Sequence, residues 1–171
     1  MIIPTIATER LVLRAMTRAD FPAFAGLWAD PAVTAHILRE PRDETASWRS
    51  FLMNAGSWAV DGIGQSAITH QGVFIGQAGF FDARRGVGAD FDGVPECGWV
   101  IAPAHQGQGF ATEALVALHR WFDDGHSESR TLITVGHVAS ERLAARLGYR
   151  QFRVVGLDGV DCGLSRRTRK V

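Results

Sequence analysis

The fold is indicated most directly by the stretch Gln106-Gly107-Gln108-Gly109-Phe110-Ala111-Thr112-Glu113-Ala114. This stretch follows the apolar run Gly98-Trp99-Val100-Ile101, which predicts a short buried strand. It leads into a segment in which apolar residues recur at helical spacing from Ala111 to Phe122. We therefore predict a strand, a glycine-rich turn and a helix in direct succession.

A glycine-rich turn at the start of a helix is suited to hold an anion. Glycine has no Cβ, so the backbone of the turn can approach a ligand closely. The first N–H groups of the helix have no intrahelical acceptor, and they lie at the positive end of the helix dipole. The turn at 106–112 therefore predicts a binding site for a phosphate or pyrophosphate group.

Two widespread phosphate motifs do not fit this turn. A Gly-x-Gly-x-x-Gly dinucleotide motif that begins at Gly107 would need a third glycine where Thr112 stands, and it belongs to a first strand–helix unit. The nucleotide P-loop requires Gly-Lys followed by Ser or Thr, which the sequence lacks. A purely structural turn before a core helix is the alternative to a phosphate site.

The pattern Gln-x-x-Gly-x-Ala at Gln106, Gly109 and Ala111 resembles the coenzyme A pyrophosphate loop of the GNAT superfamily of N-acetyltransferases. Further segments resemble one branch of that superfamily, the enzymes similar to ribosomal-protein-alanine acetyltransferase. They follow the family's order along nearly the whole chain, at residues 8–14, 76–80, 96–101 and 140–149.

The resemblance implies a fold and a reaction. We expect one domain over residues 1–171 of α/β (α+β) class, with a mixed, mostly antiparallel seven-stranded sheet flanked by about four helices. In this family the fourth and fifth strands diverge, and the pantetheine arm of coenzyme A lies in the gap. The resemblance therefore implies acetyl-CoA as co-substrate and direct transfer of its acetyl group to an amine.

Local patterns divide the chain into short elements. Apolar spacing predicts helices over 17–28 and 43–54, the first ended by Pro31 and the second by Gly56. A later helix is expected over 140–147, and the longest loop over 82–95 is a candidate wall of the substrate site. Besides the strand before the glycine-rich turn, alternation and turn residues predict strands at 9–15, 58–60, 66–69, 73–81, 131–135, 151–157 and 160–164.

Composition bounds the class of protein. The chain has 171 residues, 46% of them hydrophobic, and a formal net charge of zero. This length suits one domain with its own core, and the charge balance does not favour a nucleic-acid partner. The basic cluster at 166–170 is expected to be a solvated tail. Two cysteines and the lack of an apolar leader or spanning segment predict a cytoplasmic protein with no membrane partner.

Acetyl transfer to an amine requires a group that removes a proton from the nitrogen. The resemblance implies Glu96 as this base, because the family places a glutamate at the start of its fourth strand. Alternation puts Glu96 on one face of the strand with Val100, and Cys97 on the other face. The alternative role for Glu96 is an exposed ion pair with a nearby arginine. Backbone N–H groups near Trp99 are expected to stabilise the developing oxyanion.

The proton donor for the leaving thiolate has several candidates. Ser140 matches the serine of the family's Asn-x-x-Ser pattern, which implies a proton donor, but serine is also a preferred helix cap. His137 takes the asparagine position, where it could donate to the cofactor, act as an acid or base, or lie exposed in a loop. Tyr149 stands where the family has a packing aromatic, so we expect it in the core.

The predicted catalytic residues are therefore Glu96 and Ser140. No metal site is expected, because the histidines lack ligand spacing, and His119 is expected to be solvated. Cys97 is expected to be a small buried hydrophobe and not an acyl carrier. The predicted cofactor-binding residues are Trp99, Val100, Ile101, Gln106, Gly107, Gln108, Gly109, Phe110, Ala111, Thr112, His137 and Ser140.

Two functions of different classes follow from these residues. The first is an acetyl-CoA-dependent N-acetyltransferase, whose acceptor is a primary amine on a protein or peptide N-terminus or on a small molecule. The second is a non-catalytic domain that binds or senses acyl-CoA, for which the histidine at 137 and the missing acid tyrosine are the reasons. Relatives often form dimers, so the resemblance also allows a homodimer.

Overall fold

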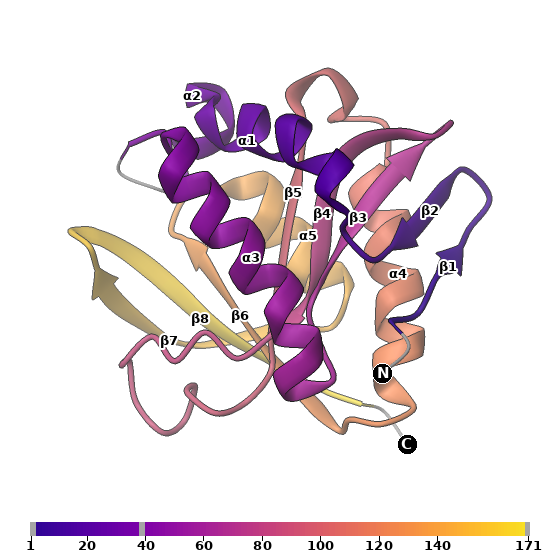
Figure 1. Ribbon diagram of the computed structural model, residues 1–171. Coiled ribbons are helices and arrows are strands. Elements are labelled where there is room, and N and C mark those ends of the chain that lie inside the picture. Colours follow the sequence, from indigo (N-terminus) through magenta and orange to yellow (C-terminus); the bar gives the residue numbers. More distant parts are fainter. Residues whose placement is uncertain (1–2, 38–39, 170–171) are drawn as a thin grey trace.

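The computed structural model describes residues 3–37 and 40–169. Its centre is an eight-stranded sheet in the order β1-β2-β3-β4-β5-β6-β8-β7 (Figure 1). Neighbouring strands are antiparallel except for β5 and β6, which are parallel. The strands are β1 Ile6–Ala7, β2 Leu11–Arg14, β3 Gln65–His70, β4 Val73–Phe81, β5 Glu96–Ile101, β6 Glu128–Thr134, β7 Arg150–Leu157 and β8 Val160–Thr168.

Helices cover both faces of this sheet. The helices are α1 Phe21–Ala29, α2 Pro31–Thr34, α3 Glu44–Asp61, α4 Phe110–Asp123 and α5 Val138–Arg146, with 3-10 turns at Arg18–Asp20 and Pro103–His105. One buried cluster joins α4 and α5 to the sheet, and a second joins α1, α2 and α3 to Val100. In Figure 1 α3 crosses the front of the sheet. The expected mixed α/β fold class is confirmed, with eight strands in place of seven.

The prediction of a strand at 58–60 is wrong, because α3 continues through these residues to Asp61. Gly56 lies inside the helix, and the helix ends instead at Gly62, whose φ of 72° is left-handed. Trp58 is buried on the same stripe as Phe51, seven residues earlier, so its environment is that of a helix face. The helix predicted over 17–28 is confirmed as a 3-10 turn at Arg18–Asp20 that continues into α1 and ends at Ala29, and a further short helix, α2, begins at Pro31.

The other predicted elements are confirmed with shifted ends. The strand, glycine-rich turn and helix follow one another as β5, the segment 102–109 and α4. The closing hairpin turns at Asp158 and Gly159, both at positive φ, as the sequence predicts for a two-residue turn. The helix expected from 140 begins two residues earlier, at Val138.

Strands β5 and β6 are joined at a single position. Their register contains one pair, Glu96 with Arg130, and the Arg130 N–H donates to the carbonyl of Pro95. Beyond this pair the two strands have no ladder partners in common, whereas β6 pairs with β8 along its whole length. The sheet therefore opens on one side of β5, as the family resemblance implies for its fourth and fifth strands.

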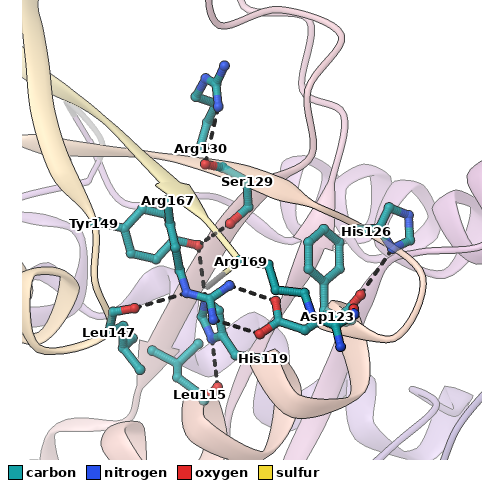
Figure 2. Close-up of polar contacts among 11 residues, drawn as sticks. Leu115, His119, Asp123, His126, Ser129, Arg130, Leu147, Tyr149, Arg167 and Arg169 are labelled. Atoms are coloured by element: carbon teal, nitrogen blue, oxygen red, sulfur yellow. Dashed lines mark hydrogen bonds and ion pairs between the residues drawn. The ribbon is translucent and has the colours of Figure 1, made fainter. Parts of the chain in front are cut away.

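A buried polar network joins α4 to the end of the sheet (Figure 2). His119 is only 4% exposed, so the expectation that it is solvated is wrong. Its Nδ1 lies 2.7 Å from the Leu115 carbonyl, which can only accept, so Nδ1 carries the proton. The neutral ring then accepts from the Tyr149 hydroxyl at Nε2, 3.0 Å away, and Ser129 Oγ lies 2.7 Å from that hydroxyl.

The basic cluster near the C-terminus is solvated at Arg166, Thr168 and Arg169, as expected, but it belongs to the sheet and is not a tail. Residues up to Thr168 belong to β8, and the guanidinium of Arg167 donates to both oxygens of Asp123 at 2.7 Å. The same guanidinium donates to the carbonyl of Leu147 (Figure 2). Lys170 lies outside the described residues. The described part of the cluster therefore ties β8 to α4.

Candidate active site

A cavity of about 530 Å³ lies beside the open side of β5. Its walls come from α1 and α3, from β5 and β6, from the beginning of α5 and from the tip of the β7–β8 hairpin. The two predicted catalytic residues, Glu96 and Ser140, both line it, as do Trp99, Val100 and His137. The cavity therefore unites residues from segments far apart in the sequence.

Glu96 lies at the start of β5 and is 3% exposed. Its two carboxylate oxygens accept from Nε and Nη2 of Arg85, at 2.6 and 2.7 Å. Burial raises the pKa of Glu96, and the Arg85 guanidinium opposes that rise. The sequence allows an exposed ion pair with an arginine as the alternative role of Glu96. The ion pair with Arg85 does form, but it is buried and borders the cavity.

Strand β5 presents backbone donors to its open side. The Ala102 N–H donates to the carbonyl of Ile75 on β4, at 2.8 Å. Because successive residues alternate in direction along a strand, the N–H groups of Trp99 and Ile101 point away from β4 and toward the gap. The N–H of Val100 points at β4, so Val100 contributes to the cavity through its side chain. Two of the three predicted strand residues therefore offer amides to a ligand.

The glycine-rich turn follows the open end of β5. Gly107 and Gly109 have φ values of 72° and 81°, a conformation that disfavours any residue with a side chain. Gly109 caps α4 without a side-chain hydrogen bond, so the first amides of the helix, at Phe110, Ala111 and Thr112, remain available. The side chain of Phe110 is buried in the core, and only its backbone faces the turn. This geometry suits a pyrophosphate group.

Side chains hold the turn in place. Gln106 donates from Nε2 to the carbonyl of Ile101, and Gln108 donates to that of Ala104. Arg10, almost a hundred residues earlier, donates from Nη1 to the carbonyl of Gln108 at 3.0 Å. These contacts occupy the side chains of the two glutamines, so their backbones are the groups left for a ligand.

Arg10 also neutralises the carboxylate nearest to the turn. Its Nε lies 2.7 Å from Oε2 of Glu113, in the first turn of α4, and its Cζ lies 4.5 Å from the centroid of the Phe110 ring. The Thr8 hydroxyl donates to the same carboxylate at 2.6 Å. A negative charge at this place would repel a pyrophosphate, and the cation beside it removes most of that repulsion.

His137 and Ser140 lie together at the start of α5. His137 is the cap residue of the helix but makes no side-chain capping bond. Its ring stacks on His36 with centroids 4.6 Å apart, and burial lowers its pKa, assisted by His36. Ser140 is the third residue of the helix, so the alternative role as a helix cap does not apply. Both side chains border the cavity.

Tyr149 does not line the cavity, whereas Cys97 lines it but is buried. Tyr149 is buried in the network with His119, which confirms that it belongs to the core. Burial raises the pKa of the Cys97 thiol to about 12, so this cysteine stays protonated. Both cysteines are free and buried. Tyr149 and Cys97 therefore both lack the exposure and charge that a nucleophile or an acid at the cavity would need.

Sequence reasoning missed two arginines at the cavity, Arg85 and Arg42. Arg85 lies in the long loop at 82–95 that the sequence marks as a candidate substrate wall, and Asp82 and Ala83 from this loop line the cavity too. The local sequence gives no sign of the pairing of Arg85 with Glu96, because that contact depends on how the loop folds back. Arg42 follows a proline in a turn and has no periodic pattern.

Within residues 3–37 and 40–169, no three or more His, Cys, Asp or Glu side chains gather in a way that could hold a metal ion. In the same ranges no helix has the length and apolar character to cross a membrane.

Comparison with known proteins identifies the class. Residues 10–150 match the family described as Acetyltransferase (GNAT) domain. The fold and the match define an acetyltransferase, and the chain belongs to the GNAT family. It is 28% identical over 119 residues to "Uncharacterized N-acetyltransferase p20" of Bacillus licheniformis, an alignment that covers 67% of this chain and 63% of that protein.

Solved structures agree over the full length of the fold. The chain is 32% identical to a structure described as "Putative GnaT-family acetyltransferase from Bordetella pertussis", with a TM-score of 0.88 and coverage of 96% of this chain and 99% of that one. A complex of RimL, a ribosomal L7/L12 alpha-N-protein acetyltransferase, with coenzyme A gives a TM-score of 0.80 at 19% identity, covering 96% and 98% of the two chains. The latter likeness concerns the fold alone.

Proposed function

We propose that this chain transfers the acetyl group of acetyl-CoA directly to a primary amine. The observation that carries the proposal is the position of the buried carboxylate of Glu96 on the cavity wall, at the start of the strand whose far end leads into the glycine-rich turn. An acid–base group and an anion site thus lie at the two ends of one open strand. Direct transfer is favoured because the Cys97 thiol is buried and protonated.

The residues present fit coenzyme A. The amides of the turn at 107–112 would hold the pyrophosphate, and the outward amides of Trp99 and Ile101 would hold the pantetheine arm in the gap. The bound co-substrate supplies an acetyl group activated as a thioester. His137 and Ser140 border the same cavity and would contact the thiol end of the co-substrate.

Glu96 would act as the base that receives the amine proton, directly or through a water molecule. Arg85 holds each carboxylate oxygen by one hydrogen bond, so a lone pair on each oxygen is left to accept a proton. One amide of the open strand edge would stabilise the negative charge on the acetyl oxygen. Ser140 is our candidate for returning a proton to the leaving sulfur.

We propose an amine at a peptide or protein N-terminus, or on a small molecule, as the acceptor. An α-amine loses its proton at lower pH than a lysine side chain, so it requires less assistance from a base. The two buried free cysteines agree with a reducing compartment, and on this ground we propose the cytoplasm as the location. A homodimer stays a prediction from the family.

A second function, a non-catalytic acyl-CoA-binding domain, is favoured by one observation. Both oxygens of Glu96 are already engaged by Arg85, as in a structural ion pair. Such a domain would bind acetyl-CoA without passing the acetyl group to any amine, and neutralising Glu96 would not change its behaviour.

The test combines binding with turnover. Calorimetry should detect acetyl-CoA binding, and thiol release should then be followed against a panel of amines and short peptides. Binding with amine-dependent thiol release supports the transferase. Tight binding with no release above the protein-free rate across the panel would favour the binding domain, and no binding at all would contradict both functions.

A further inference from the structure

Arg42 is a cation on the cavity wall without a carboxylate partner among the described residues. It lies between α2 and α3, and its backbone N–H donates to the carbonyl of Trp28 at 2.9 Å. Its guanidinium stacks on the Trp28 ring, with Cζ 4.1 Å from the centroid, and Nη1 donates to Ser50 Oγ at 2.9 Å. Burial lowers the pKa of Arg42, because no nearby acid compensates for its lost hydration.

The other charges at the cavity are engaged. Arg85 is paired with Glu96, and Asp82 is paired with Arg84 at 3.0 Å. Asp158 also has an interaction of its own. Arg42 therefore differs from its neighbours, since its contacts within the described residues are a hydroxyl, an aromatic ring and a backbone carbonyl.

An unsatisfied donor lies in contact with this guanidinium. Trp28 is 5% exposed, and its indole Nε1 has no hydrogen-bond acceptor among the described residues. A buried polar group usually has a partner, so one without a partner calls for an explanation. Two adjacent side chains that offer only N–H donors suit an anionic oxygen ligand, and a planar guanidinium suits a carboxylate in particular.

Arg42 shares the cavity with His137 and Ser140 but lies away from the predicted pyrophosphate site in the glycine-rich turn. The glycine-rich turn belongs to α4, which covers one face of the sheet, whereas Trp28 packs with Val100 in the cluster on the opposite face. Glu96 lies on that same face of β5, four residues from Val100. At a rise of about 3.3 Å per residue, the two positions are roughly 13 Å apart along the strand.

We infer that Arg42 and Trp28 form a carboxylate-binding subsite for the acceptor, so that the preferred acceptor carries a carboxylate several residues away from its reacting amine. This inference rests on the proposed acetyl transfer. An extended tripeptide spans about 10 Å at 3.3–3.6 Å per residue, and hydrogen bonds of about 3 Å at its ends extend its reach to the roughly 13 Å between the two positions. A free α-amino acid is too short to reach Glu96 and Arg42 at once. An acidic side chain near a peptide N-terminus would present the same chemistry.

Matched peptides test the subsite. The probes are Ala-Ala-Ala and its C-terminal amide, which differ in one carboxylate far from the reacting amine. We expect the acid to be acetylated with a kcat/KM about tenfold or more above that of the amide, since a charge-assisted hydrogen bond is worth about that factor. Alanine and alaninamide, as short controls, should show no preference for the acid. A higher kcat/KM for Ala-Ala-Asp amide than for Ala-Ala-Ala amide would show that a side-chain carboxylate can take the place of the terminal one.

The variant Arg42→Gln should abolish the preference for the acid and leave the rate on the amide and the affinity for acetyl-CoA within about twofold of wild type. The matched control is Arg49→Gln, an exposed arginine on α3. Three results would overturn the inference. They are equal rates on acid and amide in the wild type, an equal loss on both in Arg42→Gln, or weaker acetyl-CoA binding in that variant, which would assign Arg42 to a cofactor phosphate.

A binding measurement separates this inference from the proposed function. The indole N–H resonance of Trp28, identified by its loss in Trp28→Phe, should shift when Ala-Ala-Ala is added to the protein with coenzyme A. It should not shift with the amide, nor in Arg42→Gln. A shift without any turnover would support the subsite and contradict the transferase. Turnover without a shift would contradict the subsite alone.

Discussion

At the scale of single residues, the pair of Glu96 and Arg85 is the central feature. Burial and the guanidinium act on the carboxylate in opposite directions, and burial dominates, so the pKa of Glu96 is raised. A base with a raised pKa is better matched to neutral pH than an ordinary glutamate. The arginine keeps the buried carboxylate ionised and oriented, which an unpaired buried glutamate could not achieve.

The pH dependence of turnover follows from this pair. A base must be unprotonated, so kcat at saturating amine, which reports groups that titrate in the enzyme–substrate complex, should fall about tenfold per pH unit below the raised pKa of Glu96. The acid limb of the pH–rate profile should therefore lie at a higher pH than the ordinary pKa of a glutamate. Arg85→Gln removes the opposing cation, so the limb should move to still higher pH. A pH–rate profile checks both results, and an unmoved limb in Arg85→Gln would exclude Glu96 as the titrating base.

His119 predicts a pH dependence of stability. Burial lowers its folded pKa to about 4, below the ordinary value of 6.5, so the unfolded chain binds the extra proton more readily. Stability from this group is complete above pH 6.5 and decreases as pH falls toward 4. The loss between pH 6.5 and 5 should be about 2 kcal/mol. Urea unfolding of wild type and His119→Gln checks it, since the variant should lack this part of the acid loss. Identical pH dependence in both would contradict the assignment.

The environment of single residues was only partly predictable. Glu96 could be selected because a family motif marks it, but its partner Arg85 depends on a loop that no periodic pattern describes. The prediction that His119 is solvated is wrong, because the residue stands four residues after Leu115 and three before Phe122, on the buried stripe of α4. The helical spacing could have identified it as buried. A polar side chain does not require solvent here, because the hydroxyl of Tyr149 is a hydrogen-bond partner of the His119 ring inside the core.

At the scale of elements, the turn before α4 is the most specific feature, and it predicts a clear effect of substitution. Gly109→Glu would place a side chain at a left-handed φ and a negative charge at the anion site, so acetyl-CoA affinity should fall by about a hundredfold or more. The control is Gly93→Glu, because Gly93 has a φ of 82° and open space around it. Calorimetry that gave similar affinities for both variants would contradict the assignment of the turn.

Arg10 predicts a smaller effect on the same turn. Arg10→Ala frees the Gln108 carbonyl and leaves Glu113 without its cation, so the dissociation constant for acetyl-CoA should rise about three- to tenfold. kcat should be unchanged, because the residue is remote from Glu96. The control is Arg120→Ala, which removes an exposed arginine on α4, the helix that also carries Glu113. A lower kcat with unchanged affinity in Arg10→Ala would contradict a role in holding the turn.

Elements with strong local patterns were predictable, and the failures have local causes. The strand–turn–helix at β5 and α4 and the hairpin around Asp158 follow from glycine positions and apolar spacing. The strand expected at 58–60 failed because three apolar residues suit either structure when taken alone. Tertiary packing decides the case, since Trp58 completes the buried stripe of α3 and donates from Nε1 to the carbonyl of Gln65.

At the scale of the whole molecule, the opening between β5 and β6 organises the site. The five strands β1 to β5 and the β6–β8–β7 unit meet through one ladder pair, Glu96 with Arg130. The family resemblance predicted this opening, whereas local periodicity could not, because it does not report which strands pair. A ligand in the gap would contact both parts of the sheet and stabilise their arrangement.

Thermal unfolding tests this architecture. Acetyl-CoA at about 100 times its dissociation constant should stabilise the fold by about 2.7 kcal/mol, which corresponds to a rise in Tm of about 5 °C or more. Gly109→Glu should show little of this rise. The free protein provides the baseline for each variant. An equal rise in wild type and Gly109→Glu would place the cofactor somewhere other than the turn and the gap.

The most direct test of acetyl transfer with Glu96 as base is the initial rate of thiol release by wild type and Glu96→Gln, at saturating acetyl-CoA and with the best amine of the panel. We predict a fall in kcat of about a hundredfold or more in Glu96→Gln, with acetyl-CoA affinity within about twofold of wild type. An unchanged kcat would remove Glu96 from the mechanism. Thiol release that does not depend on the amine would contradict acetyl transfer itself.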